Sequence, residues 1–172
     1  SASVLKQYEY DEAGKLVKEE IVTEEETINN QYEYAYDEAG NVRGVVIQDA
    51  EGELVSAEMF EYDENGNLIA KEVNSEEYNY LTEYVYDGDE LLQYTYTDIK
   101  TGDVAVTTYN TTKEGNVETV EEVDYYNNVE IDRTMLVTEY DEEGRLLHAE
   151  LFDKDGMSIE SDHIEYDEKG NE

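Results

Sequence analysis

The sequence of 172 residues contains no cysteine, no proline and no tryptophan. Without cysteine the chain can form no disulfide, and it offers neither a thiol nucleophile nor a thiolate metal ligand. Basic residues are also scarce, because 11 lysines and arginines stand against 47 aspartates and glutamates, which gives a formal net charge of -36. This imbalance argues against nucleic-acid binding through phosphate neutralisation and against adsorption to anionic membranes.

Long apolar runs are missing too. No segment approaches the roughly 20 apolar residues of a membrane-spanning helix, so we expect no membrane insertion. The opening residues, SASVLKQYEY, have neither the basic start nor the apolar stretch of a signal peptide. The two histidines, His148 and His163, fall in predicted strands, where we interpret them as ordinary strand residues rather than as metal ligands. We therefore expect no cofactor.

What the chain has in abundance is a repeated string, Tyr-Asp-x-x-Gly. Its copies are Tyr10–Gly14, Tyr36–Gly40, Tyr62–Gly66, Tyr140–Gly144 and Tyr166–Gly170. The aspartates of successive copies lie 26, 26, 78 and 26 residues apart, and 78 is three times 26. Two degenerate copies, YVYDGDELL and YNTTKEGNV, fill the wide gap, and we expect a longer turn in the second. Such a period indicates a chain of similar supersecondary units.

The residue types inside one unit predict β-hairpins. An aspartate starts a turn by accepting hydrogen bonds from nearby backbone amides, and a glycine closes the turn with a positive φ. The flanking segments alternate apolar and polar residues with period two, which is typical of strands. With weaker turns between the strings, turn signals recur about every 12 to 14 residues. We predict an all-β fold over residues 1–172, a single domain of about 13 antiparallel strands in a meander, as a curled single-layer sheet or a thin sandwich.

The segment EYDEEGRLLHAELFDKDG, residues 139–156, resembles the YD repeats of bacterial Rhs-type surface and toxin proteins. Tyr140, Asp141, Gly144, Arg145 and Leu146 match the pattern Tyr-Asp-x-x-Gly-Arg-Leu of that family. The resemblance implies a bacterial β-hairpin protein that is exported, to the cell surface, the periplasm or the medium. The chain also resembles variant MORN repeats, which are short hairpins as well, but more weakly.

Two turns carry oxygen ligands that a calcium ion could use. The candidates are Asp63 and Asn65 in DENGN, and Asp153 and Asp155 in DKDG. Hard cations prefer such ligands, but the glycine comes at the fourth position, where an EF-hand loop has it at the sixth. The same letters are explained by an aspartate that starts a turn and a glycine that closes it. We expect no dedicated metal site, and at most weak calcium binding.

The 17 tyrosines offer a binding surface. Tyrosines at alternate strand positions line one face of a sheet, where they stabilise it or stack on a sugar or a peptide. The candidate ligand-binding residues are Tyr34, Tyr36, Tyr62, Tyr84, Tyr86, Tyr94 and Tyr96. We therefore expect a non-catalytic protein with a structural or binding role, and a protein or polysaccharide as its partner.

Two alternatives stay open. The first is an acidic protein whose charge is its function, as a cation binder or a decoy. The second is a carbohydrate-active enzyme, which needs two carboxylates in a cleft, although 47 acidic residues produce close pairs by chance. The edge strands of an open sheet could also pair with another copy of the chain.

Overall fold

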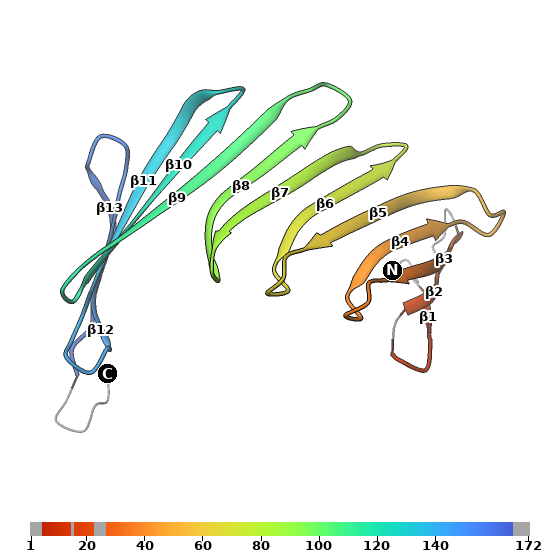
Figure 1. Cartoon of the computed structure of the whole chain (residues 1–172), viewed down its shortest axis with the longest axis horizontal. Helices are drawn as coiled ribbons and strands as arrows, with labels where there is room; N and C mark the ends of the chain where they lie inside the picture. Colours follow the sequence, from red (N-terminus) through yellow and green to blue (C-terminus); the bar gives the residue numbers. More distant parts are fainter. Residues whose placement is uncertain (1–4, 15, 23–26, 167–172) are drawn as a thin grey trace. The chain divides into compact units, whose positions relative to one another are not determined.

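The computed structural model describes residues 5–14, 16–22 and 27–166, and these residues form thirteen β-strands and no helix. The strands are β1 Leu5–Tyr10, β2 Leu16–Val22, β3 Thr27–Tyr36, β4 Val42–Gln48, β5 Leu54–Tyr62, β6 Leu68–Ser75, β7 Asn79–Asp87, β8 Glu90–Asp98, β9 Val104–Glu114, β10 Val117–Tyr126, β11 Val129–Tyr140, β12 Leu146–Phe152 and β13 Ser158–His163. The strands follow one another in the sheet in chain order, from β1 to β13 (Figure 1). The predicted antiparallel meander of about 13 strands is confirmed.

The chain divides into two compact units. Unit 1 comprises residues 1–83 with 98–102, and unit 2 comprises residues 84–97 with 103–172. Within each unit, the strands that contact one another are neighbours in sequence. The prediction of a single domain over residues 1–172 stays a prediction. None of the described segments is a helix long and apolar enough to cross a membrane.

Each unit has very little buried interior. Among the described residues, only Val73, Val123 and Thr82 are buried, and most strand residues are half-exposed on both faces. A sandwich would bury a full layer of side chains between its sheets. The low burial and the contacts between sequence neighbours therefore fit the single-layer alternative within each unit.

Stability comes instead from strand ladders and from cross-strand side-chain pairs. In β3 and β4, Tyr32 lies opposite Ile47 and Tyr34 lies opposite Val45. Pairs of an aromatic and a β-branched residue each contribute roughly 0.2–1 kcal/mol beyond an alanine pair. The tyrosine ring supplies apolar area while its hydroxyl reaches water or a polar partner, as half-exposed sheet faces require.

The Tyr-Asp-x-x-Gly strings form the hairpin turns between strands, as predicted. In the third copy the Gly66 amide donates to the carbonyl oxygen of Asp63 at 3.1 Å, and Gly66 has a φ of 88°. Four of the strings connect two described strands, and in each of them the strand pairing contains a β-bulge just before the tyrosine. In the third copy this bulge lies between Glu61 and Tyr62. This bulge belongs to a turn that ends in a left-handed residue, a common hairpin connection. Asp167 and Gly170 of the last copy lie outside the described residues.

The degenerate copies differ in turn length. Between β9 and β10, Glu114 pairs with Val117, so the turn has only two residues, Gly115 and Asn116. The longer turn expected there was wrong. Two further turns are equally tight, at residues 88–89 and at Asn127 with Asn128, whose φ angles are 49° and 66°. Two-residue hairpins favour positive φ, which asparagine tolerates better than most residues.

Replacing turn and strand glycines should have opposite effects. In Gly66→Ala, an alanine must adopt a φ of 88°, and we expect a loss of about 1–2 kcal/mol of unfolding free energy in urea titrations. Gly44 lies inside β4, where a Cβ would meet the Glu58 carbonyl oxygen at an ordinary 3.5 Å. Gly44→Ala should leave stability unchanged or raise it by up to about 1 kcal/mol. Equal losses in both variants would contradict the assigned turn conformation.

Candidate functional site

The aspartate of each described string accepts hydrogen bonds within its own turn. In the second copy, Oδ1 of Asp37 accepts the Asn41 amide at 2.8 Å, and Oδ2 accepts the Asn41 side-chain amide at 3.0 Å. The third copy repeats this arrangement between Asp63 and Asn67. The hydrogen bonds from the Asn41 side chain and backbone hold the pKa of Asp37 below its usual range. The ionised carboxylate is therefore part of the turn.

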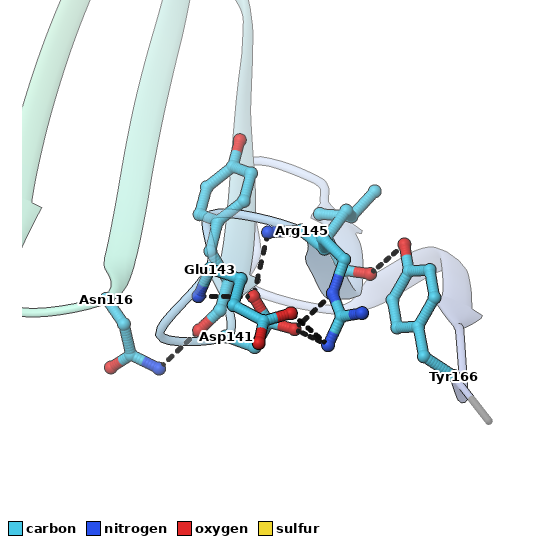
Figure 2. A network of polar contacts seen from close by, with 7 residues as sticks. Asn116, Asp141, Glu143, Arg145 and Tyr166 are labelled. Carbon is cyan, nitrogen blue, oxygen red and sulfur yellow. Dashed lines mark hydrogen bonds and ion pairs between the residues drawn. The ribbon is translucent and has the colours of Figure 1, made fainter. Parts of the chain in front are cut away.

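The fourth copy uses an arginine in place of the asparagine (Figure 2). The Arg145 amide donates to Oδ1 of Asp141 at 2.9 Å, and its guanidinium donates to Oδ2 at 2.6 Å. The same guanidinium forms an ion pair with Glu143 and lies over the ring of Tyr166, 4.6 Å from its centroid. Asn116, from the turn between β9 and β10, donates to the backbone oxygen of Tyr140 at 2.7 Å. The network thus joins the β9–β10 turn, the β11–β12 turn and Tyr166, which follows β13.

The tyrosine of one copy also bonds to the copy before it. The Tyr62 hydroxyl donates to the carbonyl oxygen of Val42 at 3.1 Å, and the Tyr166 hydroxyl donates to that of Leu146 at 3.0 Å. Both bonds reach back 20 residues, to the first residue of a strand that follows an earlier turn. The string is therefore a structural element that links hairpins, and its tyrosine has a defined partner in both cases.

The two calcium candidates are engaged in the same way. Oδ1 of Asp63 accepts the amides of Asn65 and Asn67, each at 2.9 Å, and Oδ1 of Asp153 accepts those of Asp155 and Met157. Among the described residues, no three histidine, aspartate or glutamate side chains converge as the ligands of a metal ion do. The structure explains these residues as turn formers.

The candidate tyrosines fall into two groups. Tyr34, Tyr36 and Tyr62 belong to unit 1, and the rings of Tyr34 and Tyr36 stack with centroids 6.4 Å apart. The other four, Tyr84, Tyr86, Tyr94 and Tyr96, belong to unit 2. There the ring of Tyr84 contacts both Tyr86 and Tyr94, at 6.4 and 5.3 Å. The four tyrosines of unit 2 are half-exposed and form the denser aromatic group.

Carboxylates continue this aromatic group across the neighbouring strands of unit 2. Tyr94 on β8 lies opposite Thr107 on β9, which lies opposite Asp124 on β10, which lies opposite Asp132 on β11. Directly opposed residues share one face of a sheet. The Thr107 hydroxyl confirms this by donating to Oδ1 of Asp124 at 2.6 Å. One row across four strands thus begins with a tyrosine and ends with two carboxylates.

A parallel row adds two more groups to this face. Tyr109 on β9 lies opposite Glu122 on β10. Burial raises the pKa of Glu122, and the negative charges of Asp124 and Asp132 raise it further. The pKa of Tyr109 is also raised, by burial and by the charges of Glu122 and Asp124. Within the part of the chain that the structure describes, no ion pair reaches Glu122, Asp124 or Asp132. The Thr107 hydroxyl donates to Asp124 and the Arg133 backbone amide donates to Asp132, and both of these donors are neutral.

The pairing of these carboxylates was not predicted, because it depends on the register between two strands. A two-residue turn at Asn127 and Asn128 sets the register of β10 against β11, and one bulge then places Asp124 opposite Asp132. Like charges directly opposite one another are destabilising, so a pair of facing aspartates indicates a candidate binding site once the register is known. Without the register, both residues resemble any of the other 45 acidic residues in the chain.

The two histidines are also brought together. His148 on β12 lies opposite His163 on β13, with ring centroids 6.2 Å apart. Both lie on strands, as expected, and the hairpin turn at residues 153–156 sets their register.

A scan of known family models and a search of characterised proteins find no match to this chain. Among solved structures, similarity is found to one titled "Crystal Structure of TcdB2-TccC3", with 12% sequence identity and a TM-score of 0.41. The match covers 93% of this chain and 13% of that chain.

The turn carboxylate should give Asp141→Asn a pH-dependent effect on stability. Hydrogen bonds from the backbone amide and the side chain of Arg145 lower the pKa of Asp141 in the folded state. Desolvation of the carboxylate opposes this shift but does not cancel it. The charged carboxylate therefore stabilises the fold above the unfolded pKa of about 3.9, and this contribution disappears as the pH falls through the lower, folded pKa. We expect a lower melting temperature than wild type at neutral pH and a difference that closes at acidic pH.

Glu142→Gln is the matched control for this prediction, because it removes one charge from the adjacent, exposed position of the same turn. Its melting temperature relative to wild type should depend little on pH. If Asp141→Asn followed the control at every pH, the carboxylate would have no specific role in the turn.

Calcium and magnesium should stabilise the protein equally at equal concentration. The candidate turn carboxylates already accept backbone amides, so both ions are expected to act by screening the net charge of -36. Thermal melts in CaCl2 and MgCl2 of matched ionic strength measure this. A saturable stabilisation by micromolar calcium alone would instead show a dedicated calcium site.

Proposed function

We propose that the protein is a non-catalytic β-repeat protein that binds another protein, and that its binding surface is the tyrosine–carboxylate face of unit 2. This face consists of Tyr84, Tyr86, Tyr94, Tyr96, Tyr109, Glu122, Asp124 and Asp132. The observation that carries the proposal is the row from Tyr94 through Thr107 to Asp124 and Asp132, together with Tyr109 opposite Glu122 in the parallel row. No ion pair among the described residues reaches these three carboxylates. The turn networks account for the repeated string itself, so the binding function is assigned to residues outside it.

The chemistry of this face fits a basic segment of a partner protein. A lysine or arginine over a tyrosine ring gains a cation–π interaction, and its charged head can then bond to a neighbouring carboxylate. Such a partner would relieve the repulsion between Asp124 and Asp132, to which no ion pair among the described residues brings a cation. A neutral glycan could stack on the tyrosines but would leave these charges uncompensated. Charge complementarity thus favours a cationic protein over a polysaccharide.

The extent of the row also favours a peptide segment. Neighbouring strands lie about 4.8 Å apart, so a row across four strands spans about 14 Å. That length exceeds one basic side chain and corresponds to roughly four residues of extended chain, at about 3.3 Å per residue. Electrostatic attraction from the net charge of -36 would also speed the approach of such a partner.

We further propose that the protein acts outside the cytoplasm, at the surface of a bacterial cell or in the periplasm. The support is the match of Tyr140, Asp141, Gly144, Arg145 and Leu146 to the YD-repeat pattern, together with their observed role as a hairpin turn. Self-association through the edge strands β1 and β13 would have to overcome the repulsion between two chains of like charge.

Binding to a synthetic ten-residue peptide of alternating arginine and glycine tests the proposed face. The triple variant Glu122→Gln/Asp124→Asn/Asp132→Asn removes its three carboxylates and keeps their shapes, and we expect at least about tenfold weaker binding in physiological salt. The double variant Tyr94→Ala/Tyr96→Ala should also weaken binding, because it removes two aromatic rings of the proposed face. Isothermal titration calorimetry measures each affinity.

The control is the triple variant Glu38→Gln/Glu64→Gln/Glu142→Gln, which removes the same number of charges from exposed turn positions. It should bind almost as wild type does. Equal losses in the two triple variants would mean diffuse attraction to an acidic surface and would refute the proposed face. A peptide with citrulline in place of arginine should bind much more weakly, and equal binding would refute the cationic partner.

A further inference from the structure

The only two histidines of the chain meet across the hairpin of β12 and β13. The Ile164 amide donates to the Leu147 carbonyl at 2.9 Å, so residues 147 and 164 form a hydrogen-bonded pair. The adjacent pair, His148 and His163, is therefore a non-hydrogen-bonded pair, in which opposite side chains come closest. Both imidazoles project from the same face, with their ring centroids 6.2 Å apart.

The first histidine is oriented as metal-binding histidines usually are. Nδ1 of His148 lies 2.8 Å from the carbonyl oxygen of Asp162. A carbonyl only accepts hydrogen bonds, so Nδ1 carries the hydrogen, and Nε2 of the neutral ring keeps a free lone pair. A metal-ligating histidine commonly donates its other N–H to a backbone carbonyl in this way, which fixes the ring and its tautomer.

A carboxylate lies beside that nitrogen. Oε2 of Glu150 is 3.5 Å from Nε2 of His148, and the two residues share a face of β12 because they are two positions apart. Two ligands of one tetrahedral Zn²⁺ lie about 3.4 Å apart, given metal–ligand bonds of about 2.1 Å. The His148 and Glu150 atoms are thus already at the separation that one zinc ion requires.

We propose that His148, Glu150 and His163 form a binding site for a borderline divalent transition metal, with Zn²⁺ as the representative ion and water completing the coordination. In the described structure three ligands do not yet converge, so the His163 ring must rotate toward the ion. That side chain is 65% exposed, and the rotation would replace the 3.9 Å contact between its Nε2 and Oε1 of Glu165. Imidazole suits Zn²⁺, Ni²⁺ and Cu²⁺, whereas Ca²⁺ and Mg²⁺ prefer oxygen ligands, so the site is distinct from the turn carboxylates.

The bound ion would fasten β13, the last strand in the sheet order, to its neighbour. Because the metal would bind the folded hairpin and not the unfolded chain in the same geometry, it would raise the stability of unit 2 by mass action. The inference does not depend on the tyrosine–carboxylate face, since it concerns different strands and a different ligand.

Titration calorimetry with ZnCl2, in physiological salt and millimolar MgCl2 to occupy the diffuse acidic surface, tests the site. We expect one saturable zinc per chain, and an affinity at least about tenfold lower in His148→Gln, in His163→Gln and in Glu150→Gln. Glu142→Gln, which removes an exposed turn carboxylate, should bind as wild type does. Histidine variants with wild-type affinity, or zinc binding that magnesium abolishes, would overturn the proposal.

Nickel titration of the wild-type protein, followed by NMR, gives a test that needs no variant. Paramagnetic Ni²⁺ should first broaden the amide signals around residues 148, 150 and 163. Broadening that begins at the turn aspartates, or that is uniform over the acidic surface, would also overturn the proposal.

Discussion

The bond between the motif aspartate and the backbone amides of its own turn is the interaction on which the rest of the structure depends. Each unit is a single layer with almost no buried interior, so strand register cannot be set by packing against a second layer. A one-residue slip would move every tyrosine to the opposite face. The carboxylate of Asp63 or Asp141 prevents such a slip, because it fixes the turn length and so the register of both strands. The faces follow from the turns.

The tyrosines extend this local order from one hairpin to the next. The hydroxyls of Tyr62 and Tyr166 bond to carbonyls 20 residues earlier, so these two strings are each tied to the strand that follows an earlier turn. In a repeat array each unit contacts only its neighbours, and stability is a sum of such nearest-neighbour terms. These hydrogen bonds require a constant repeat length, because an inserted residue would move the tyrosine hydroxyl away from its carbonyl acceptor. This explains why the repeat spacing could be read directly from the sequence.

Sequence patterns were sufficient for the fold because its determinants are local. Aspartate, glycine and alternating apolar residues act within a few positions, so the strands, their order and the turns of the Tyr-Asp-x-x-Gly strings could be predicted. The tight turn at Gly115 and Asn116 could not, since it departs from the string that the prediction followed. The candidate sites depend on relations between strands. Asp124 opposes Asp132 only through a bulge, and His148 opposes His163 only through the register of the turn at residues 153–156.

The surplus of acidic residues can be understood from the same architecture. A sheet without a deep interior leaves nearly every carboxylate hydrated, so most of the 47 acidic residues cost little as individuals. The exception is the face of unit 2 where Asp124 lies opposite Asp132 and Glu122 lies beside them, with burial and like charges raising the pKa of Glu122. A fold that could place these charges anywhere on two open faces has gathered three of them next to its densest group of tyrosines. This arrangement opposes stability in the free protein, and a cationic partner is the kind of ligand that would turn it into binding energy.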